Sequence, residues 1–213
     1  MKDPRIAMEF PQDSSQWKNA SATFTDESLQ IFGHPVMEAW EKPYMKKIAS
    51  IACSNGGKVL EVGFGMGISA GYIQQHKIEE HVIIEANAEV FTKLEEFAKI
   101  AKHPVNPLFG FWQDVVKSIP SNSFDGILFD TYPIKKDQIR KSRFEFFSTA
   151  YRLLKKKGVF TYFCSEIELT SFERQRLNEA GFNNMNGVLC QVNPPNNCLY
   201  WQSNVILAPT IIK

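Results

Sequence analysis

The clearest pattern along the chain is an alternation of short apolar runs with stretches whose apolar residues recur every three or four positions. Short apolar runs predict strands, and the helical spacing predicts amphipathic helices. The expected strands are 58–62, 81–85, 105–110, 123–130 and 159–164, and the expected helices are 66–76, 88–99, 140–154 and 170–179. Strands that alternate with helices indicate an α/β fold, in which a mainly parallel sheet carries helices on both faces.

The N-terminal part of the chain departs from this alternation. Residues 1–24 are polar and predict a partly irregular arm. Residues 26–31 predict a short helix, which ends at Gly33-His34-Pro35. Residues 35–53 have the apolar spacing of an amphipathic helix. We therefore expect residues 1–54 to be an arm and helices that cover the active site of a single domain, 1–213.

The C-terminal part predicts a hairpin. Apolar residues at 182–192 and 198–207 flank the turn Asn193-Pro194-Pro195-Asn196-Asn197. A hairpin at this point adds an antiparallel strand to the sheet, because its two strands run in opposite directions. With the five strands above, the expected sheet has seven strands and is mostly parallel, with one antiparallel strand at the C-terminal end.

Three glycines at the end of the first expected strand carry the strongest chemical signal. Val59-Leu60-Glu61-Val62 runs into Gly63, Gly65 and Gly67, and Glu85 ends the next strand. Such a turn exposes backbone N–H groups at a helix N-terminus, and an acid at the second strand's tip suits ribose hydroxyls. The pattern predicts a pocket for a nucleoside-bearing cofactor. A plain strand–helix turn with structural glycines is the alternative.

The glycine spacing separates the possible cofactors. The dinucleotide fingerprint places glycines at i, i+2 and i+5, and the P-loop requires Gly-Lys-Ser/Thr; neither pattern occurs here. Gly67-Ile68-Ser69-Ala70-Gly71 matches a hydrolase nucleophile elbow, but Ser69 lies past the turn and no histidine follows Asp125 or Asp130. The run Leu60-Glu61-Val62-Gly63-Phe64-Gly65 instead resembles motif I of S-adenosylmethionine-dependent methyltransferases. That cofactor has a carboxylate and a ribose, and it has no phosphate.

Composition narrows the class of protein further. The 213 residues are 44% hydrophobic, and 24 Lys and Arg nearly balance 23 Asp and Glu, so nucleic acid is not an expected partner. Neither a signal peptide nor an apolar run of membrane-spanning length is visible, so no membrane partner is expected. Four cysteines without a Cys-x-x-Cys pair, and scattered histidines, indicate reduced thiols and no metal site. We expect a cytoplasmic protein, either monomeric or dimeric.

Four segments together resemble one methyltransferase family. They are 32–45, 60–66, 124–133 and 151–155, and they include Val36-Met37-Glu38-Ala39-Trp40-Glu41 and Asp130-Thr131-Tyr132-Pro133. These segments are similar to guanidinoacetate N-methyltransferase, a Rossmann-like class I methyltransferase. The resemblance implies that Glu41 and Asp130 hold a guanidinium. A guanidinium presents planar pairs of N–H groups that fit carboxylates.

The resemblance also assigns roles to further residues. It implies that Glu41, Asp130, Thr131 and Tyr132 bind the substrate, and that Asp130 and Glu41 are catalytic. It implies that the cofactor contacts Trp17, Met45, Glu61, Gly63, Gly65, Met66, Gly67, Glu85, Trp112, Gln113 and Asp130. Gln113 stands where the family has a Glu that faces adenine.

The implied reaction is transfer of a methyl group to a guanidino nitrogen, as in the conversion of guanidinoacetate to creatine. A guanidinium has no free lone pair, so Asp130 is expected to take a proton as transfer proceeds while Glu41 holds the other edge. Two alternatives remain open. One is an arginine-directed guanidino methyltransferase, acting on free or peptidyl arginine, and the other is an inactive cofactor-binding homologue.

The segment 163–177 departs from the family. It is shorter, and it carries two acids, Glu166 and Glu168, near where the family holds the substrate carboxylate with a Leu-Thr backbone. Leu169-Thr170 repeats that dipeptide at a shifted position. Since like charges at close range repel, we expect guanidinoacetate to lack unique preference, with arginine or agmatine competing measurably.

Overall fold

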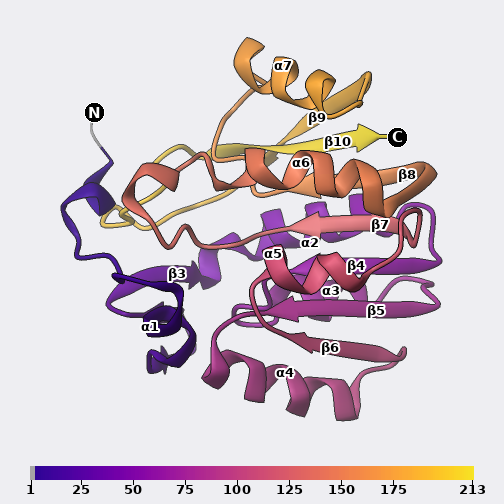
Figure 1. Cartoon of the computed structure of the whole chain (residues 1–213). Helices are drawn as coiled ribbons and strands as arrows, with labels where there is room; N and C mark the ends of the chain where they lie inside the picture. The colour runs from indigo at the N-terminus through magenta and orange to yellow at the C-terminus, as the bar shows by residue number, and fades with distance from the viewer. Residues whose placement is uncertain (1–2) are drawn as a thin grey trace.

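The computed structural model describes residues 3–213, and its centre is a seven-stranded sheet (Figure 1). The sheet order is β6-β5-β4-β7-β8-β10-β9. The strands are β4 (Lys58–Val62), β5 (Glu80–Glu85), β6 (Val105–Phe109), β7 (Phe124–Phe129), β8 (Leu154–Tyr162), β9 (Asn184–Gln191) and β10 (Val205–Ile212). Strands β4 to β8 pair in parallel, and β10 is antiparallel to both β8 and β9. The expected mostly parallel sheet with an antiparallel C-terminal strand is therefore confirmed.

Helices cover both faces of this sheet, as expected. They are α2 (Lys42–Ala52), α3 (Ile68–Ile73), α4 (Ala88–Ile100), α5 (Trp112–Val115), α6 (Ser142–Leu153) and α7 (Ser171–Glu179). Side chains alternate along β4, so Val59 joins the core of α2–α4 while Leu60 joins the core of α5–α7. In the described residues, no helix is long and apolar enough to cross a membrane.

The N-terminal region differs from the expected helices. It contains a 3₁₀ turn (Pro4–Ala7), helix α1 (Ser14–Asn19) and a three-stranded sheet of β1 (Ala22–Phe24), β2 (Ser28–Ile31) and β3 (His34–Glu38).

The expected helix at 26–31 is therefore wrong, and the helix expected at 35–53 begins only at Lys42. Leu29 and Ile31 are buried while Gln30 is exposed, which is the period of a strand. Phe32 and Gly33 take positive φ angles and make the tight turn that pairs β2 with β3.

The C-terminal hairpin exists, but its second strand is displaced. It was expected at 198–207 and is observed at Val205–Ile212. The connection between β9 and β10 is therefore longer, and it buries Cys198, Tyr200 and Trp201. Because these side chains are buried, this part of the chain packs against the core and does not pair as a strand. Tyr200 therefore lies at the end of the sheet where the parallel strands finish.

The parallel strands end on one side of the molecule, and the N-terminal segment lies at that side (Figure 1). Asn87, the N-cap of α4, fixes the segment there, since its side-chain amide donates to the carbonyls of Trp17 (3.0 Å) and Ala20 (2.8 Å). The N-terminal segment therefore stands over the ends of β4, β5 and β7, where open α/β sheets bind ligands.

Candidate active site

One large pocket opens at the carboxyl ends of the parallel strands. It encloses about 1390 Å³, counting the space that is open to solvent. Ten of the residues predicted from the sequence line it: Trp17, Glu41, Gly63, Gly65, Glu85, Trp112, Gln113, Asp130, Thr131 and Tyr132. The structure thus brings together residues from the N-terminal arm, from the ends of β4, β5 and β7, and from the start of α5.

The turn after β4 allows the backbone to approach a ligand and its neighbouring strand. Gly63 has φ +95°, and a Cβ there would lie 1.9 Å from the carbonyl oxygen of Asp130. The Gly63 N–H donates to the Ile84 carbonyl (2.8 Å), and the Asp130 N–H donates to the Val62 carbonyl (2.9 Å). Only glycine fits at position 63, and this close approach sets Asp130 beside the turn.

Glu85 lines the same pocket and also holds the turn in place. One carboxylate oxygen accepts the Phe64 N–H at 3.0 Å, and the other accepts those of Ala86 (2.7 Å) and Asn87 (2.8 Å). Burial raises the pKa of Glu85, although these backbone hydrogen bonds act in the opposite direction. The acid predicted to bind ribose is therefore also a structural acceptor for the glycine turn.

Aromatic side chains form the walls next to this turn. Trp112 packs edge-on against Phe129 and Phe146, with centroid distances of 6.0 and 5.1 Å. Trp17 stacks on Tyr132 with a centroid distance of 5.5 Å and an interplanar angle of 6°. Flat apolar surfaces of this kind suit a heterocyclic ring.

Glu41 is buried in the pocket wall, with 2% of its surface exposed. One carboxylate oxygen, Oε1, accepts from the Tyr200 hydroxyl (2.6 Å) and from the Glu38 N–H (2.9 Å). Within residues 3–213 no group donates to the other oxygen, Oε2. Two donors on Oε1 fix the carboxylate and leave Oε2 available to a ligand.

Asp130 faces Glu41 across the pocket as a second carboxylate. Burial raises the pKa of Asp130, and the negative charge of Glu61 adds to the rise. Burial also raises the pKa of Glu41, and the charge of Asp130 adds to it. Within the described chain no donor contacts the Asp130 carboxylate. The pair therefore lacks a cation, and it retains a proton well above the usual range of a carboxyl group.

Beyond these acids the pocket wall includes Arg5 and Tyr200, two residues that the sequence did not indicate. Arg5, buried at 7% exposure, lies over the rings of Tyr132 and Tyr200, 5.7 Å from each centroid. The Tyr132 hydroxyl lies 3.0 Å from Nδ1 of His34. Burial raises the pKa of Tyr132 to about 12, so this hydroxyl stays protonated.

Four predicted cofactor residues do not line the pocket. The carboxylate of Glu61 is fully buried between the Ser69 hydroxyl and Nε2 of His81, 3.0 Å away. Met45 is fully buried in the core. Met66 and Gly67 continue the glycine turn toward α3, where Gly67 is the N-cap.

Met37, rather than Met45, is the methionine of this region that lines the pocket. Its sulfur accepts the Met66 N–H at 3.4 Å. The difference arises because 34–38 is a strand, so Met37 points into the pocket rather than along a helix.

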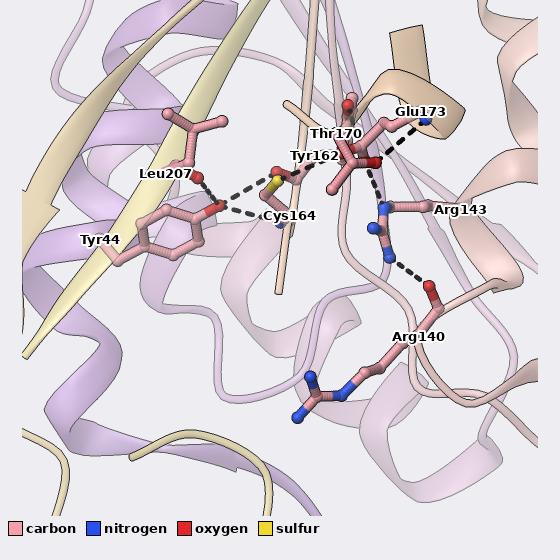
Figure 2. Close-up of polar contacts among 8 residues, drawn as sticks. All are labelled: Tyr44, Arg140, Arg143, Tyr162, Cys164, Thr170, Glu173 and Leu207. Carbon is pink, nitrogen blue, oxygen red and sulfur yellow. Dashed lines mark hydrogen bonds and ion pairs between the residues drawn. The ribbon is translucent and has the colours of Figure 1, made fainter. Parts of the chain in front are cut away.

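A buried polar cluster supports the far wall of the pocket (Figure 2). Glu173 on α7 accepts from Arg143 Nε (2.7 Å) and from the Tyr162 hydroxyl (3.1 Å). Arg143 also donates to the Arg140 carbonyl. The Tyr44 hydroxyl accepts the Cys164 N–H at 3.1 Å. These contacts tie the loop after β7 and the loop after β8 to the sheet.

The acids of the segment 163–177 lie elsewhere than expected. Glu166 and Glu168 are outside the pocket lining, and Thr170 is the N-cap of α7, accepting the Glu173 N–H at 3.1 Å. Leu169 is buried in the core beneath α7. The lining at this end carries Phe163, Ser165, Arg140 and Arg143 instead. The expected repulsion of a substrate carboxylate by the two acids therefore has no structural basis.

Comparisons with known proteins place the chain in a family. A family model described as guanidinoacetate N-methyltransferase matches residues 7–213. Protein arginine N-methyltransferase 2 of Yarrowia lipolytica is 34% identical over 152 residues, covering 66% of this chain and 31% of that protein. The Aspergillus oryzae protein of the same name is 35% identical over 164 residues, covering 74% of this chain and 39% of that protein. The chain therefore spans about a third of the length of these relatives.

Solved structures share the fold at low identity. Spermidine synthase from Thermotoga maritima has a TM-score of 0.64 at 18% identity, covering 90% of this chain and 71% of that one. TYW2 of M. jannaschii in complex with AdoMet has a TM-score of 0.59 at 15% identity, covering 92% and 85%. These matches establish a Rossmann-like methyltransferase fold. Since the family model covers nearly the whole chain, this protein belongs to the guanidinoacetate N-methyltransferase family.

Proposed function

We propose that this protein is an S-adenosylmethionine-dependent methyltransferase that transfers a methyl group to a guanidino nitrogen of a small molecule. The observation that carries the proposal is the pair of carboxylates, Glu41 and Asp130, in one pocket to which residues 3–213 supply no cation between them. A guanidinium supplies the missing positive charge and fits two carboxylates through its planar N–H pairs.

The residues of the other half of the pocket fit the methyl donor. S-adenosylmethionine is the cofactor of the family to which the chain belongs. The turn at Gly63 and Gly65 is a backbone cradle that a Cβ would fill, since a Cβ at Gly65 would lie 3.0 Å from the Met37 sulfur. Glu85 would hold the ribose, and the rings of Trp17 and Trp112 would flank the pocket. Met45, Met66 and Gly67 would then support the cofactor pocket by packing behind it. Glu61 would act through its negative charge, which contributes to the raised pKa of Asp130.

When bound, S-adenosylmethionine supplies an electrophilic methyl group. A guanidinium lacks a nucleophilic lone pair, so it must lose a proton to a residue of the chain as it is methylated. Asp130 accepts a proton from the attacking nitrogen as the new carbon–nitrogen bond forms, and its raised pKa favours that transfer. Glu41 holds another edge of the guanidinium through Oε2, while Tyr200 keeps the carboxylate from turning. Fixed orientation of the nitrogen contributes a large part of the rate.

A second candidate is an arginine-directed enzyme, which the names of the relatives favour. Free arginine and peptidyl arginine offer the same guanidinium. The buried walls at Arg5 and Tyr200 argue for a small molecule over a peptide, because a peptide backbone needs an open groove.

The test is transfer of an isotope-labelled methyl group from S-adenosylmethionine to a panel of guanidines, read by mass spectrometry. The panel holds guanidinoacetate, free arginine, agmatine and an arginine-bearing peptide. We expect transfer to a small guanidine, and loss of transfer in Asp130→Asn. Asp114→Asn is the matched control, because Asp114 is an exposed carboxylate paired with Lys117. Donor binding without transfer to any guanidine would identify an inactive homologue and contradict the proposal.

A further inference from the structure

We propose that two buried side chains, His81 and Gln74, preserve a negative charge behind Asp130 and so set how strongly that carboxylate holds a proton. The charge is that of Glu61, which is fully buried beside His81. None of Glu61, Gln74 and His81 lines the pocket, so they are positioning residues that act through Asp130. The inference rests on the proposed function, because it concerns the step in which Asp130 accepts a proton.

The pairing of the strands puts Glu61 and Asp130 on the same face of the sheet. Glu61 on β4 is opposite Leu128 on β7, and Asp130 follows Leu128 by two residues. Side chains alternate along a strand, and the Asp130 N–H continues the ladder by donating to the Val62 carbonyl at 2.9 Å. The Asp130 side chain therefore shares a face with Leu128 and Glu61, and the charge of Glu61 adds to the rise that burial causes in the pKa of Asp130.

The contacts of His81 fix its protonation state. The amide oxygen of Gln74 accepts the His103 N–H at 2.7 Å, so the amide NH₂ group faces Nδ1 of His81, at 3.3 Å. An amide NH₂ group can only donate, so Nδ1 accepts and carries no proton. Nε2 lies 3.0 Å from a carboxylate oxygen of Glu61, and it carries the proton of the ring because two lone pairs at that distance repel. His81 is therefore neutral.

A neutral His81 leaves the charge of Glu61 uncompensated. An imidazolium in the same place would cancel that charge, whereas a neutral ring only donates a proton toward it. The Ser69 hydroxyl donates to the other carboxylate oxygen and adds no charge. Burial and the charge of Glu61 raise the pKa of the nearby Cys53 thiol to about 12, so this thiol stays neutral as well. One negative charge therefore remains on this face of the sheet, away from water.

The other titratable groups that face Asp130 do not cancel this charge. Glu41 is a second acid, and Tyr44 stays protonated because burial raises its pKa well above the usual range. The arginines of the pocket lining are paired with other carboxylates, namely Arg143 with Glu173, and Arg5 and Arg140 with Asp3. A general base works best when its pKa lies near the working pH, and a retained negative charge behind Asp130 moves its pKa in that direction.

The effect of the charge is tested with Glu61→Gln, which keeps the size of the side chain. Glu95→Gln is the control, because Glu95 is exposed on α4. The pKa of Asp130 is followed by carbon NMR of the ligand-free protein, with Asp130→Asn to assign the signal, and the pH dependence of kcat/KM is measured in parallel. We expect both to move to lower pH by about one unit in Glu61→Gln, since a nearby charge shifts a carboxyl pKa by roughly 1–3 units.

The protonation state of His81 is tested by nitrogen NMR, which needs no variant and so decides the matter even if Glu61→Gln does not fold. We expect a bare Nδ1 and a protonated Nε2 over the pH range in which Asp130 titrates. Gln74→Glu keeps an acceptor for His103 and replaces the donor to Nδ1 by an acceptor. His81 should then take a second proton, and the pKa of Asp130 should fall. Gln75→Glu adds the same charge at an exposed neighbouring position and should change neither.

An imidazolium, or a proton on Nδ1, in the unmodified protein would overturn the inference. So would a pKa of Asp130 that is the same in Glu61→Gln and Glu95→Gln, even if Glu61→Gln lowered turnover equally at every pH, because that result describes a packing role. If no guanidine is methylated but the pKa of Asp130 falls in Glu61→Gln, the proposed function fails and this inference stands. If guanidines are methylated and that pKa does not move, the function stands and this inference fails.

Discussion

The proposed cofactor end and the proposed guanidine end of the pocket are built in different ways. At the cofactor end, Gly63 and Glu85 stand at the tips of neighbouring strands, and hydrogen bonds between those tips fix their spacing. Asp130 ends β7 and is held by the same network, although it belongs to the proposed guanidinium clamp. At the guanidine end, Glu41 is fixed by Tyr200, which lies 159 residues away along the chain. A local motif thus encodes one half of the site, while long-range packing assembles the other.

This difference predicts how each half responds to substitution. Substitutions at the cofactor end should remove one contact with the cofactor without rearranging the pocket wall, since neighbouring strands hold the backbone in place. Substitutions at the guanidine end disturb a series of side-chain contacts. Their effects should therefore appear mainly in substrate binding. The predictions below test this division.

The largest effect is expected for Asp130→Asn. Asparagine keeps the size of the side chain but cannot accept the proton, and it turns a donor toward a donor-rich guanidinium. We expect kcat to fall at least a hundredfold, within the range of about 10²–10⁴ for general base catalysis. Calorimetry should give unchanged affinity for S-adenosylhomocysteine. Retention of more than about a tenth of wild-type kcat, a change of roughly 1.4 kcal/mol, would mean that Asp130 is not the base.

The next effect is expected for Glu85→Ala, measured as affinity for S-adenosylhomocysteine. The substitution removes the proposed ribose acceptor and the hydrogen-bond partner of the N–H groups of Phe64, Ala86 and Asn87. We expect affinity to fall by roughly 1.5–3 kcal/mol, the value of hydrogen bonds to a charged group. Thermal stability should fall as well.

Glu95→Gln is the control for Glu85, because Glu95 is exposed on α4. NAD should not bind the wild-type protein. Calorimetry that detected NAD but not the nucleoside thioether would refute the assignment of this half of the pocket.

A smaller effect is expected for Tyr200→Phe. The Glu41 carboxylate loses the hydroxyl donor on Oε1 but keeps the Glu38 N–H. We expect the KM for the guanidine to rise by about tenfold, with a smaller change in kcat. This is the lower end of the roughly 1.5–3 kcal/mol that one hydrogen bond to a charged group contributes, because the Glu38 N–H still holds the carboxylate. Tyr151→Phe, on α6 and outside the pocket lining, is the control. A fall in kcat with unchanged KM would place Tyr200 in the chemical step instead.

The same division explains what the sequence could predict. Strand ends follow from apolar runs, so the positions of the glycine turn and Glu85 follow from the pattern. Asp130 also ends an expected strand, but its role follows from the family resemblance. The strand at 28–31 carried a usable signal, since Leu29 and Ile31 alternate with polar residues, but four residues are too few to separate a strand from a helical turn. Met37 was missed as a consequence, because it sits in the strand β3 that pairs with β2.

Arg5, Arg140 and Tyr200 carried no such signal. Arg5 lies in a short 3₁₀ turn and the other two lie in irregular chain, and each reaches the pocket only because distant segments pack together. Their positions depend on contacts such as Asp3 with Arg140, separated by 137 residues, which no local pattern encodes.

The smallest expected effect, and the most diagnostic one, is the uptake and release of protons by the carboxylates of Glu41 and Asp130. Burial raises the pKa of both Glu41 and Asp130, so the ligand-free pair holds a proton that the unfolded chain has already lost. Because the folded state binds more protons than the unfolded state, this pair makes stability fall as pH rises from the ordinary carboxyl range, near about pH 4, through the raised pKa values. A bound guanidinium removes this preference for the protonated form, since its positive charge favours two ionised carboxylates.

Guanidine binding should therefore release protons, and affinity should rise with pH over the window in which stability falls. Calorimetry in buffers of different ionisation enthalpy measures the release, and thermal melts between about pH 5 and 9 measure the stability, a range that reaches well above the usual carboxyl pKa values. Asp130→Asn should abolish most of the release, because only one titratable partner remains. Affinity that is independent of pH in the wild type would mean that both carboxylates are already ionised without ligand, and Asp130 would then be a fixed charge rather than a proton acceptor with a raised pKa.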